Sequence, residues 1–152
     1  MSLKEEIKEF FRGEVADDPA TLGKYSHDAS IFEIKPKLVV FPKDSDDLGK
    51  LVAFVAHQKG DDPSLSLTAR SAGTDMSGGA INDSIIVAFE KYFTKIDPLE
   101  DRSIAVEPGV FYRDMEKATL AKGLLMPSYP ASLEICMVGG MVANNAGGEK
   151  SL

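Results

Sequence analysis

The order of apolar segments between residues 37 and 90 constrains the fold more than any other feature of this sequence. The run Leu38–Phe41 lies between two prolines and has no polar alternation, which is typical of a buried strand. A helical stripe follows, with Ser45 as the expected N-cap and two aspartates in the first turn. This order predicts a small α/β subdomain near residues 37–90. Its elements are a strand at 38–41, a helix from 45 to about 60, a strand at 65–69, an irregular segment at 71–80 and a strand at 85–89.

The N-terminal residues predict a separate helix. Ser2 and Glu5 have the spacing of a capping box, and apolar residues fall on one stripe over residues 3–12. Gly13 is placed to end this helix in the left-handed conformation. The polar stretch at residues 17–19 predicts a linker that lets the helix pack independently. We therefore divide the chain into an N-terminal helix and linker, residues 1–24, and a second unit, residues 25–152.

The second half of the chain repeats the strand and helix theme. A strand is expected at 104–106 and a helix at 112–122, which Gly123 closes. Beyond Met126 the pattern becomes irregular, and four glycines gather between residues 139 and 148. Because a domain seldom ends directly after such a cluster, we expect that the chain is truncated relative to its gene or that more sequence follows.

Composition excludes several classes of protein. With 152 residues and 43% hydrophobic content, the chain can bury a core without a disulfide or a structural metal. Its single cysteine, Cys136, is expected to be a small buried side chain, and no pattern of metal ligands is present. The excess of 24 acidic over 17 basic residues makes nucleic acid an unsuitable partner. No apolar stretch is long enough for a transmembrane helix, and no secretory signal is expected. We place the protein in the cytoplasm or at the membrane periphery.

Two segments carry the chemistry. The segment Arg70–Gly79 lies between two predicted strands, where its glycines permit positive φ and let backbone N–H groups form a nest for an anion. It has neither the P-loop nor the Rossmann pattern, and a flexible connection between strands is the alternative interpretation. The segment Pro127–Gly148 contains small residues that let a planar ligand approach the backbone, with Asn144 and Asn145 as hydrogen-bonding groups. A tight structural turn is the alternative there.

Four segments in this order resemble one known family. They are Pro36–Pro42, Arg70–Gly79, Val106–Val110 and Pro127–Gly148. Together they are similar to the FAD-binding domain of FAD-linked oxidases and dehydrogenases, whose fold is shared by vanillyl-alcohol oxidase and p-cresol methylhydroxylase (the PCMH type). The D-lactate and glycolate dehydrogenase branch is the most similar pattern. The resemblance implies an α+β fold with a first α/β subdomain, the start of a second from about residue 103, and FAD between them.

The resemblance also implies the site residues. The loop around the FAD pyrophosphate would comprise Ser71, Ala72, Gly73, Thr74, Asp75, Met76, Ser77 and Gly78, and Pro42 would lie near the adenine. Near the diphosphate, ribityl chain and flavin ring would lie Ser132, Gly139, Gly140, Asn145, Ala146 and Gly147. Thr74 stands where members with covalent FAD carry a histidine, so non-covalent FAD is expected. No metal is expected, because no Cys/His cluster is present. Two departures are Asp75, where the family often has glycine, and Met137, where it commonly has threonine.

The resemblance finally implies an activity. The complete protein would be an enzyme that oxidises a 2-hydroxy acid of the D-lactate or glycolate type by hydride transfer to FAD, followed by transfer of electrons to an acceptor. Its catalytic residues are unknown and are expected beyond Leu152, so the 152-residue chain alone is expected to be inactive. The alternative is a non-catalytic module that binds a nucleotide or a partner.

Overall fold

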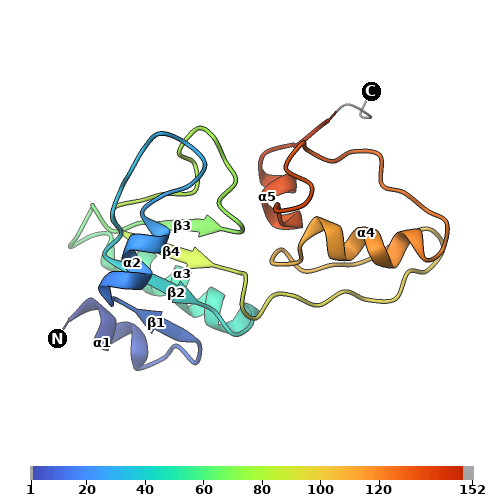
Figure 1. Ribbon diagram of the computed structural model, residues 1–152. Coiled ribbons are helices and arrows are strands. Elements are labelled where there is room, and N and C mark those ends of the chain that lie inside the picture. Colours follow the sequence, from blue (N-terminus) through green and yellow to red (C-terminus); the bar gives the residue numbers. More distant parts are fainter. Residues whose placement is uncertain (1, 149–152) are drawn as a thin grey trace.

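A four-stranded mixed sheet forms the first part of the molecule (Figure 1). The computed structural model describes residues 2–148. The strand order is β1-β2-β4-β3, in which β2, β4 and β3 are parallel and β1 is antiparallel to β2. The strands are β1 (Glu14–Ala16), β2 (Leu38–Phe41), β3 (Leu67–Arg70) and β4 (Ile85–Ala88). The three strands expected between residues 37 and 90 are confirmed.

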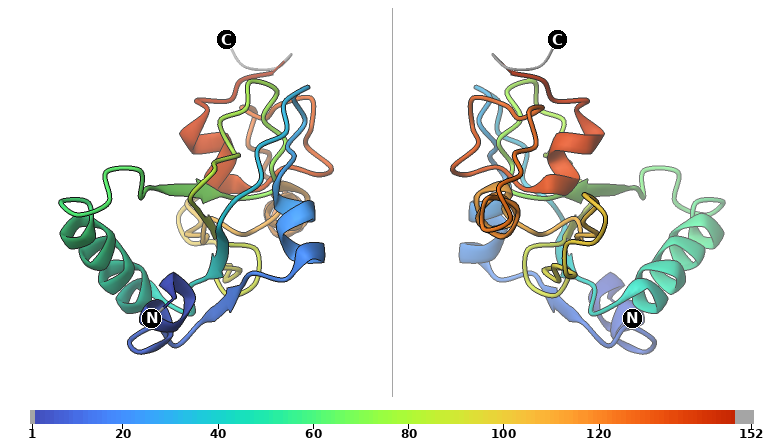
Figure 2. Two further views of the ribbon diagram at one scale, coloured as in Figure 1. Left: turned by 90° about the vertical axis from the view of Figure 1, so that its left-hand side faces the viewer. Right: turned by 90° about the vertical axis from the view of Figure 1, so that its right-hand side faces the viewer.

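Helices cover both faces of this sheet (Figure 2). Alternate side chains of β2 and β4 pack on one face against α1 (Leu3–Lys8) and α3 (Ser45–Gln58). The other side chains pack against α2 (Pro19–Tyr25). Burial on both faces explains why both strands are continuous apolar runs rather than alternating ones.

The N-terminal segment differs from the expectation. The capping box of Ser2 and Glu5 is confirmed, but the helix ends at Lys8. The expected linker instead contributes β1 and α2, and the helix does not pack independently, because Ile7 belongs to the core cluster of the sheet. Gly13 is not among the residues with positive φ. A side chain there would collide with the Phe41 carbonyl, so the close approach of two strands requires this glycine.

Helix α3 begins at the expected residue, but its N-cap differs from the predicted one. Its N-cap is Asp44 rather than Ser45, and the Asp44 carboxylate accepts from the backbone N–H groups of Asp46 and Asp47. Asp47 is fully buried and accepts hydrogen bonds from the backbone and the guanidinium of Arg12. This contact fastens the segment after α1 to the start of α3.

The second part of the molecule, residues 94–148, has little regular structure. Helix α4 (Tyr112–Leu120) is confirmed, and Gly123 ends it with φ near +70°. The expected strand at 104–106 is wrong, because Val106 forms only an isolated bridge with Ile96. Instead, a short helix that the sequence did not predict, α5 (Val138–Ala143), lies in the glycine cluster. A small cluster of buried side chains joins these two helices, and its members are Val110, Tyr112, Met115, Cys136 and Met141.

We call residues 2–93 the sheet lobe and residues 94–148 the second lobe. Gly109 joins them closely: its N–H donates to the Phe93 carbonyl at 2.8 Å, and a side chain at Gly109 would collide with the Phe89 carbonyl. No helix within residues 2–148 is long and apolar enough to cross a membrane. The expected truncation concerns Leu152, which lies outside the described residues.

Candidate cofactor-binding site

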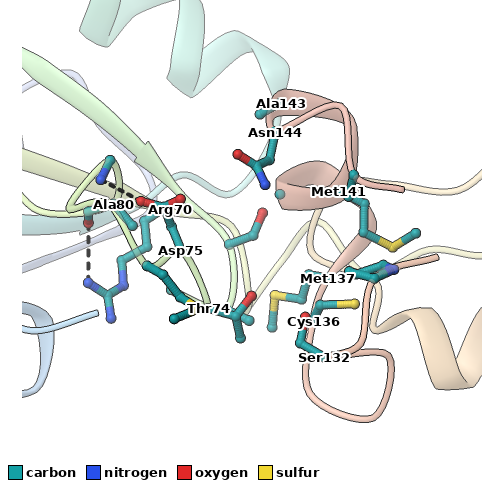
Figure 3. Close-up of a pocket in the computed structure, with 18 of the residues that line it drawn as sticks. Arg70, Thr74, Asp75, Ala80, Ser132, Cys136, Met137, Met141, Ala143 and Asn144 are labelled. Carbon is teal, nitrogen blue, oxygen red and sulfur yellow. Dashed lines mark hydrogen bonds between the residues drawn. The ribbon is translucent and has the colours of Figure 1, made fainter. Parts of the chain in front are cut away.

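A cavity of about 800 Å³ lies between the two lobes (Figure 3). One wall is the loop that follows β3, and the other is the segment that leads into and through α5. The cavity lies where β3 ends, which is where parallel α/β sheets commonly bind ligands. Its lining comprises residues 69–77, 79 and 80 from the sheet lobe, and residues 130–132, 136, 137, 140, 141, 143, 144 and 146 from the second lobe.

The cavity brings together most of the residues that the sequence singled out. Those that line it are Ser71, Ala72, Gly73, Thr74, Asp75, Met76, Ser77, Ser132, Gly140 and Ala146. Those outside its lining are Pro42, Gly78, Gly139, Asn145 and Gly147. Pro42 is fully buried at the end of β2. Asn145 has φ of 47°, and its neighbour Asn144 lines the cavity instead.

Positive φ angles shape the loop after β3. Gly73 has φ of +70° and Gly78 has φ of +86°, conformations that side chains disfavour. Within residues 2–148, the backbone N–H groups of Ala72, Gly73 and Thr74 have no hydrogen-bond acceptor. Consecutive free N–H groups beside a left-handed residue are the elements of an anion-binding nest. This turn is therefore the part of the loop that can receive a phosphate group.

Asp75 organises the rest of this loop. Its carboxylate accepts from the Gly79 N–H at 2.7 Å, from the Ser77 N–H at 3.1 Å and from the Ser77 hydroxyl at 2.9 Å. The Gly79 N–H is the main cause that lowers the pKa of the Asp75 carboxyl. A free carboxylate would repel a diphosphate, but here donors of the loop itself bind the negative charge of Asp75. Because Asp75 occupies the N–H groups of Ser77 and Gly79, the nest for an anion is shorter than the predicted segment Arg70–Gly79.

The carbonyl of Pro108 joins the two walls. It accepts from the Ser71 hydroxyl at 3.3 Å and from the Gly139 N–H at 3.0 Å. A Cβ atom at Gly139 would lie 2.6 Å from Pro108 Cβ and 2.9 Å from Ser71 Oγ, so a side chain there would push the lobes apart. Although Gly139 lies outside the lining, its small size lets the two walls meet.

Sulfur-containing side chains form much of the second wall. Cys136, Met137 and Met141 line the cavity and are all buried. The expectation of a buried cysteine is confirmed, and burial raises the pKa of its thiol. Met137 stands where a threonine hydroxyl was expected in the family. This wall therefore offers apolar, polarizable contact rather than hydrogen bonds.

Arg70 is the main lining residue that the sequence analysis did not include among the site residues. It is the last residue of β3 and only 8% exposed. Its guanidinium donates to the carbonyls of Ala80 at 3.2 Å and Tyr25 at 3.4 Å and lies over the Tyr25 ring. Figure 3 shows the bond to Ala80, which spans the base of the loop.

These features fit a flavin dinucleotide. A turn whose free N–H groups can receive a phosphate lies on one wall, and an apolar surface suited to a flat ring system lies on the other. The side-chain amide of Asn144 adds a donor and an acceptor at the same cavity. Within residues 2–148, no cluster of histidine, cysteine and acidic side chains is arranged to hold a metal ion.

Comparison with known proteins gives sequence relatives among oxidases and dehydrogenases. Residues 36–152 match the FAD binding domain family. The chain is 27% identical over 132 residues to glycolate oxidase subunit GlcD of Bacillus subtilis, covering 84% of this chain and 27% of that protein. It is 33% identical over 118 residues to a D-lactate dehydrogenase of Archaeoglobus fulgidus, covering 76% of this chain and 25% of the relative. The chain thus spans about a quarter of the length of these two relatives.

Solved structures show the same fold. The chain superposes on an alkyldihydroxyacetonephosphate synthase with a TM-score of 0.77 at 19% sequence identity, covering 95% of this chain and 31% of that one. A BBE-like 1 variant of Physcomitrella patens gives a TM-score of 0.70 at 17% identity, covering 93% and 30%. These similarities confirm the PCMH-type α+β fold that the sequence predicted. The chain therefore belongs to the FAD binding domain family of FAD-linked oxidases and dehydrogenases.

Proposed function

We propose that this chain is the FAD-binding part of a flavin-dependent enzyme that oxidises a 2-hydroxy acid of the D-lactate or glycolate type. The observation that carries this proposal is the meeting of the loop after β3 and the α5 segment at one cavity. The names of the relatives, a glycolate oxidase subunit and a D-lactate dehydrogenase, support the substrate class. A D-2-hydroxyglutarate dehydrogenase of Pseudomonas putida, 28% identical over 143 residues, has a substrate of the same chemical class.

The residues of the cavity would divide the work of holding the cofactor. The free N–H groups of Ala72, Gly73 and Thr74 would bind the diphosphate. Met137 and Met141 would contact the ring system and exclude water from it. Bound FAD would accept a hydride from C2 of the hydroxy acid, whose hydroxyl proton leaves to a base, and pass the electrons to an acceptor.

We further propose that FAD is held without a covalent bond. The side chain at position 74 is a threonine, which does not form the histidyl link of covalent members of the family. In this proposal the catalytic groups belong to a part of the protein outside the described residues. Residues 25–152 would then be one portion of the FAD-binding domain.

The test is a flavin assay on the purified full-length gene product. We expect a yellow protein with one FAD per polypeptide, whose flavin is bleached anaerobically by D-lactate or glycolate. Acid precipitation should release all of the flavin into the supernatant. A colourless protein that cannot be loaded with FAD would contradict the proposal and favour a non-catalytic binding module. A yellow protein that none of these acids bleaches would contradict the substrate class alone.

A further inference from the structure

Arg70 is an unusual buried cation. Its side chain is 8% exposed, and the two hydrogen bonds that it makes both leave from Nη1. Within residues 2–148, its Nε and Nη2 atoms have no hydrogen-bond partner, although a guanidinium carries five N–H donors. Neither atom is among the fully buried groups without a partner, and Arg70 lines the cavity, so water can reach these donors and a bound group can replace it.

The free side of the guanidinium lies directly beneath Gly73. A Cβ atom at Gly73 would be 2.7 Å from Arg70 Cζ and 2.9 Å from Nε, and it would collide with Nη2. The phosphate-binding turn therefore rests on the cation. Two features therefore require a glycine at position 73: its positive φ and its close contact with the Arg70 side chain.

A second unpaired group lies near this cation. Asp28 Oδ2 is the one buried side-chain oxygen or nitrogen in the described residues that lacks a hydrogen-bond partner. Burial lowers the pKa of the Arg70 guanidinium below its usual value, although Tyr25, Asp28 and Glu90 act in the opposite direction. Tyr25 also stabilises the cation, with its ring 5.1 Å from Cζ. Both hydrogen-bond acceptors of the guanidinium are neutral carbonyls, so its positive charge is not neutralised by a hydrogen-bonded carboxylate within the described residues.

We propose that Arg70 is a positioning residue for the cofactor: it holds the turn at residues 72–74 in place and supplies a buried positive charge behind it. This inference rests on the proposed function. An anion on the free N–H groups of the turn would meet the field of the Arg70 guanidinium through the backbone of Gly73. In this protein interior the charge is screened less than a surface charge would be.

The test measures FAD affinity, not activity. The apoprotein of the full-length gene product is titrated with FAD, and flavin fluorescence gives the dissociation constant. Arg70→Met removes the charge, Arg70→Lys retains it, and Lys59→Met removes one charge from an exposed residue at the end of α3. We expect Arg70→Met to weaken binding by about tenfold or more, and Arg70→Lys to stay within about threefold of the wild type. Lys59→Met should leave the affinity unchanged.

A coupling measurement tests the contact with Gly73. In the wild-type background Gly73→Ala suffers both the positive φ and the collision with Arg70, whereas beside Arg70→Met only the φ penalty remains. The loss of affinity caused by Gly73→Ala should therefore shrink at least about threefold in the Arg70→Met background. Circular dichroism and thermal unfolding of each variant separate loss of binding from loss of folding. If Arg70→Met does not fold, the comparison of Arg70→Lys with wild type decides.

Each outcome separates this inference from the proposed function. Normal FAD affinity in Arg70→Met would overturn the inference and leave the proposed function intact. Equal loss in folded Arg70→Lys and Arg70→Met would show that packing, not charge, is what Arg70 supplies, which also overturns it. If the wild-type apoprotein does not bind FAD, the proposed function itself fails and the inference fails with it.

Discussion

The two lobes differ in how their apolar side chains are covered. In the sheet lobe all eight side chains of β2 and β4 are buried, with helices on both faces. In the second lobe a single small cluster packs around α4 and α5. Large apolar side chains remain exposed in both lobes, by 96% at Ile31 and 80% at Met76 in the sheet lobe and by 57% at Ile135 and 76% at Val142 in the second lobe. The difference between the lobes therefore lies in their buried cores.

This difference suggests that the sheet lobe contributes most to the stability of the fold, and that the junction with the second lobe contributes most to cofactor binding. The sheet lobe has the buried area that stabilises a fold, since free energy of burial scales with apolar area removed from water. The second lobe contributes one wall of the cavity and is joined to the sheet lobe at few points, among them Pro108, Gly109 and Gly139. Substitutions in the sheet should therefore act on unfolding, and substitutions at the junction should act on the cofactor.

The largest expected effect is in the middle of the sheet. Ile86→Ala leaves a cavity at a fully buried position and should lower the free energy of unfolding by about 2–5 kcal/mol. Val52→Ala, at a half-exposed position on α3, is the matched control and should stay within about 0.5 kcal/mol. Urea unfolding followed by circular dichroism measures both. Equal effects would show that stability does not reside in the sheet.

A junction glycine should give a smaller loss of stability and a clear loss of binding. Gly139→Ala forces Pro108 and Ser71 away from α5 and should cost about 1–3 kcal/mol together with FAD affinity. Gly49→Ala, at an exposed position of α3 away from the cavity, is the control, because a Cβ there would meet nothing within 4 Å. FAD titration and thermal unfolding of the two variants should separate them. Similar behaviour would mean that the junction does not hold the cavity in shape.

Acid should weaken the sheet lobe through Asp47. Burial alone would raise the pKa of this carboxyl, but backbone N–H groups of Lys43 and Arg12 and the Arg12 guanidinium lower it overall. A lowered pKa stabilises the fold above the ordinary value of 3.8, and this stability is lost as the pH falls through the folded value. Asp47→Asn should cost about 1 kcal/mol at neutral pH and flatten the acid dependence. Urea unfolding at pH 6 and at about pH 3 gives the comparison, and an unchanged slope would exclude Asp47 as its source.

The smallest expected effect is the loss of one hydrogen bond across the junction. Ser71→Ala removes the donor to the Pro108 carbonyl and should cost about 0.5–1 kcal/mol, with weaker FAD binding. Ser64→Ala removes a hydroxyl bound only to exposed groups, such as Asp62, and should change neither property measurably. Differential scanning calorimetry and FAD titration can resolve the pair. FAD affinity unchanged in Ser71→Ala would show that the hydrogen bond between Ser71 and Pro108 is not needed to hold the cavity in shape.

The hydrophobic pattern of a segment predicted those helices and strands whose buried face is marked by their own apolar residues. Strands β2 and β4 and helices α3 and α4 follow from apolar runs and stripes. Strand β1 was not predicted, because only Val15 of its three residues is buried and its place depends on pairing with β2. The strand expected at 104–106 failed for the opposite reason: the apolar pattern is present, but no neighbouring strand pairs along it.

The sequence predicted the loops of the site, but it did not predict helix α5 or the role of Arg70, which hold those loops in place. Glycines and hydroxyl residues identified the loop after β3, and the spacing of Asp75 and Ser77 is an Asx-turn signal that could have predicted the inward carboxylate. Helix α5 could not be predicted, because two glycines in six residues are poor helix formers and contacts with Pro108 hold it. Arg70 gives no local signal, since its surroundings come from Tyr25 and Ala80, distant in sequence.

The parallel pairing of β3 with β4 has a consequence for how this site tolerates changes in length. Two adjacent parallel strands require the chain to travel back along the sheet, and here residues 71–84 make that return without a helix. The return must cover the length of four strand residues, about 13 Å, in addition to the detour around the cavity. Deletions in this segment would shorten the path and pull β3 out of register, whereas insertions near its exposed tip at Met76 would leave both strands paired. Members of the family can therefore be expected to differ in this segment by gains of residues more often than by losses.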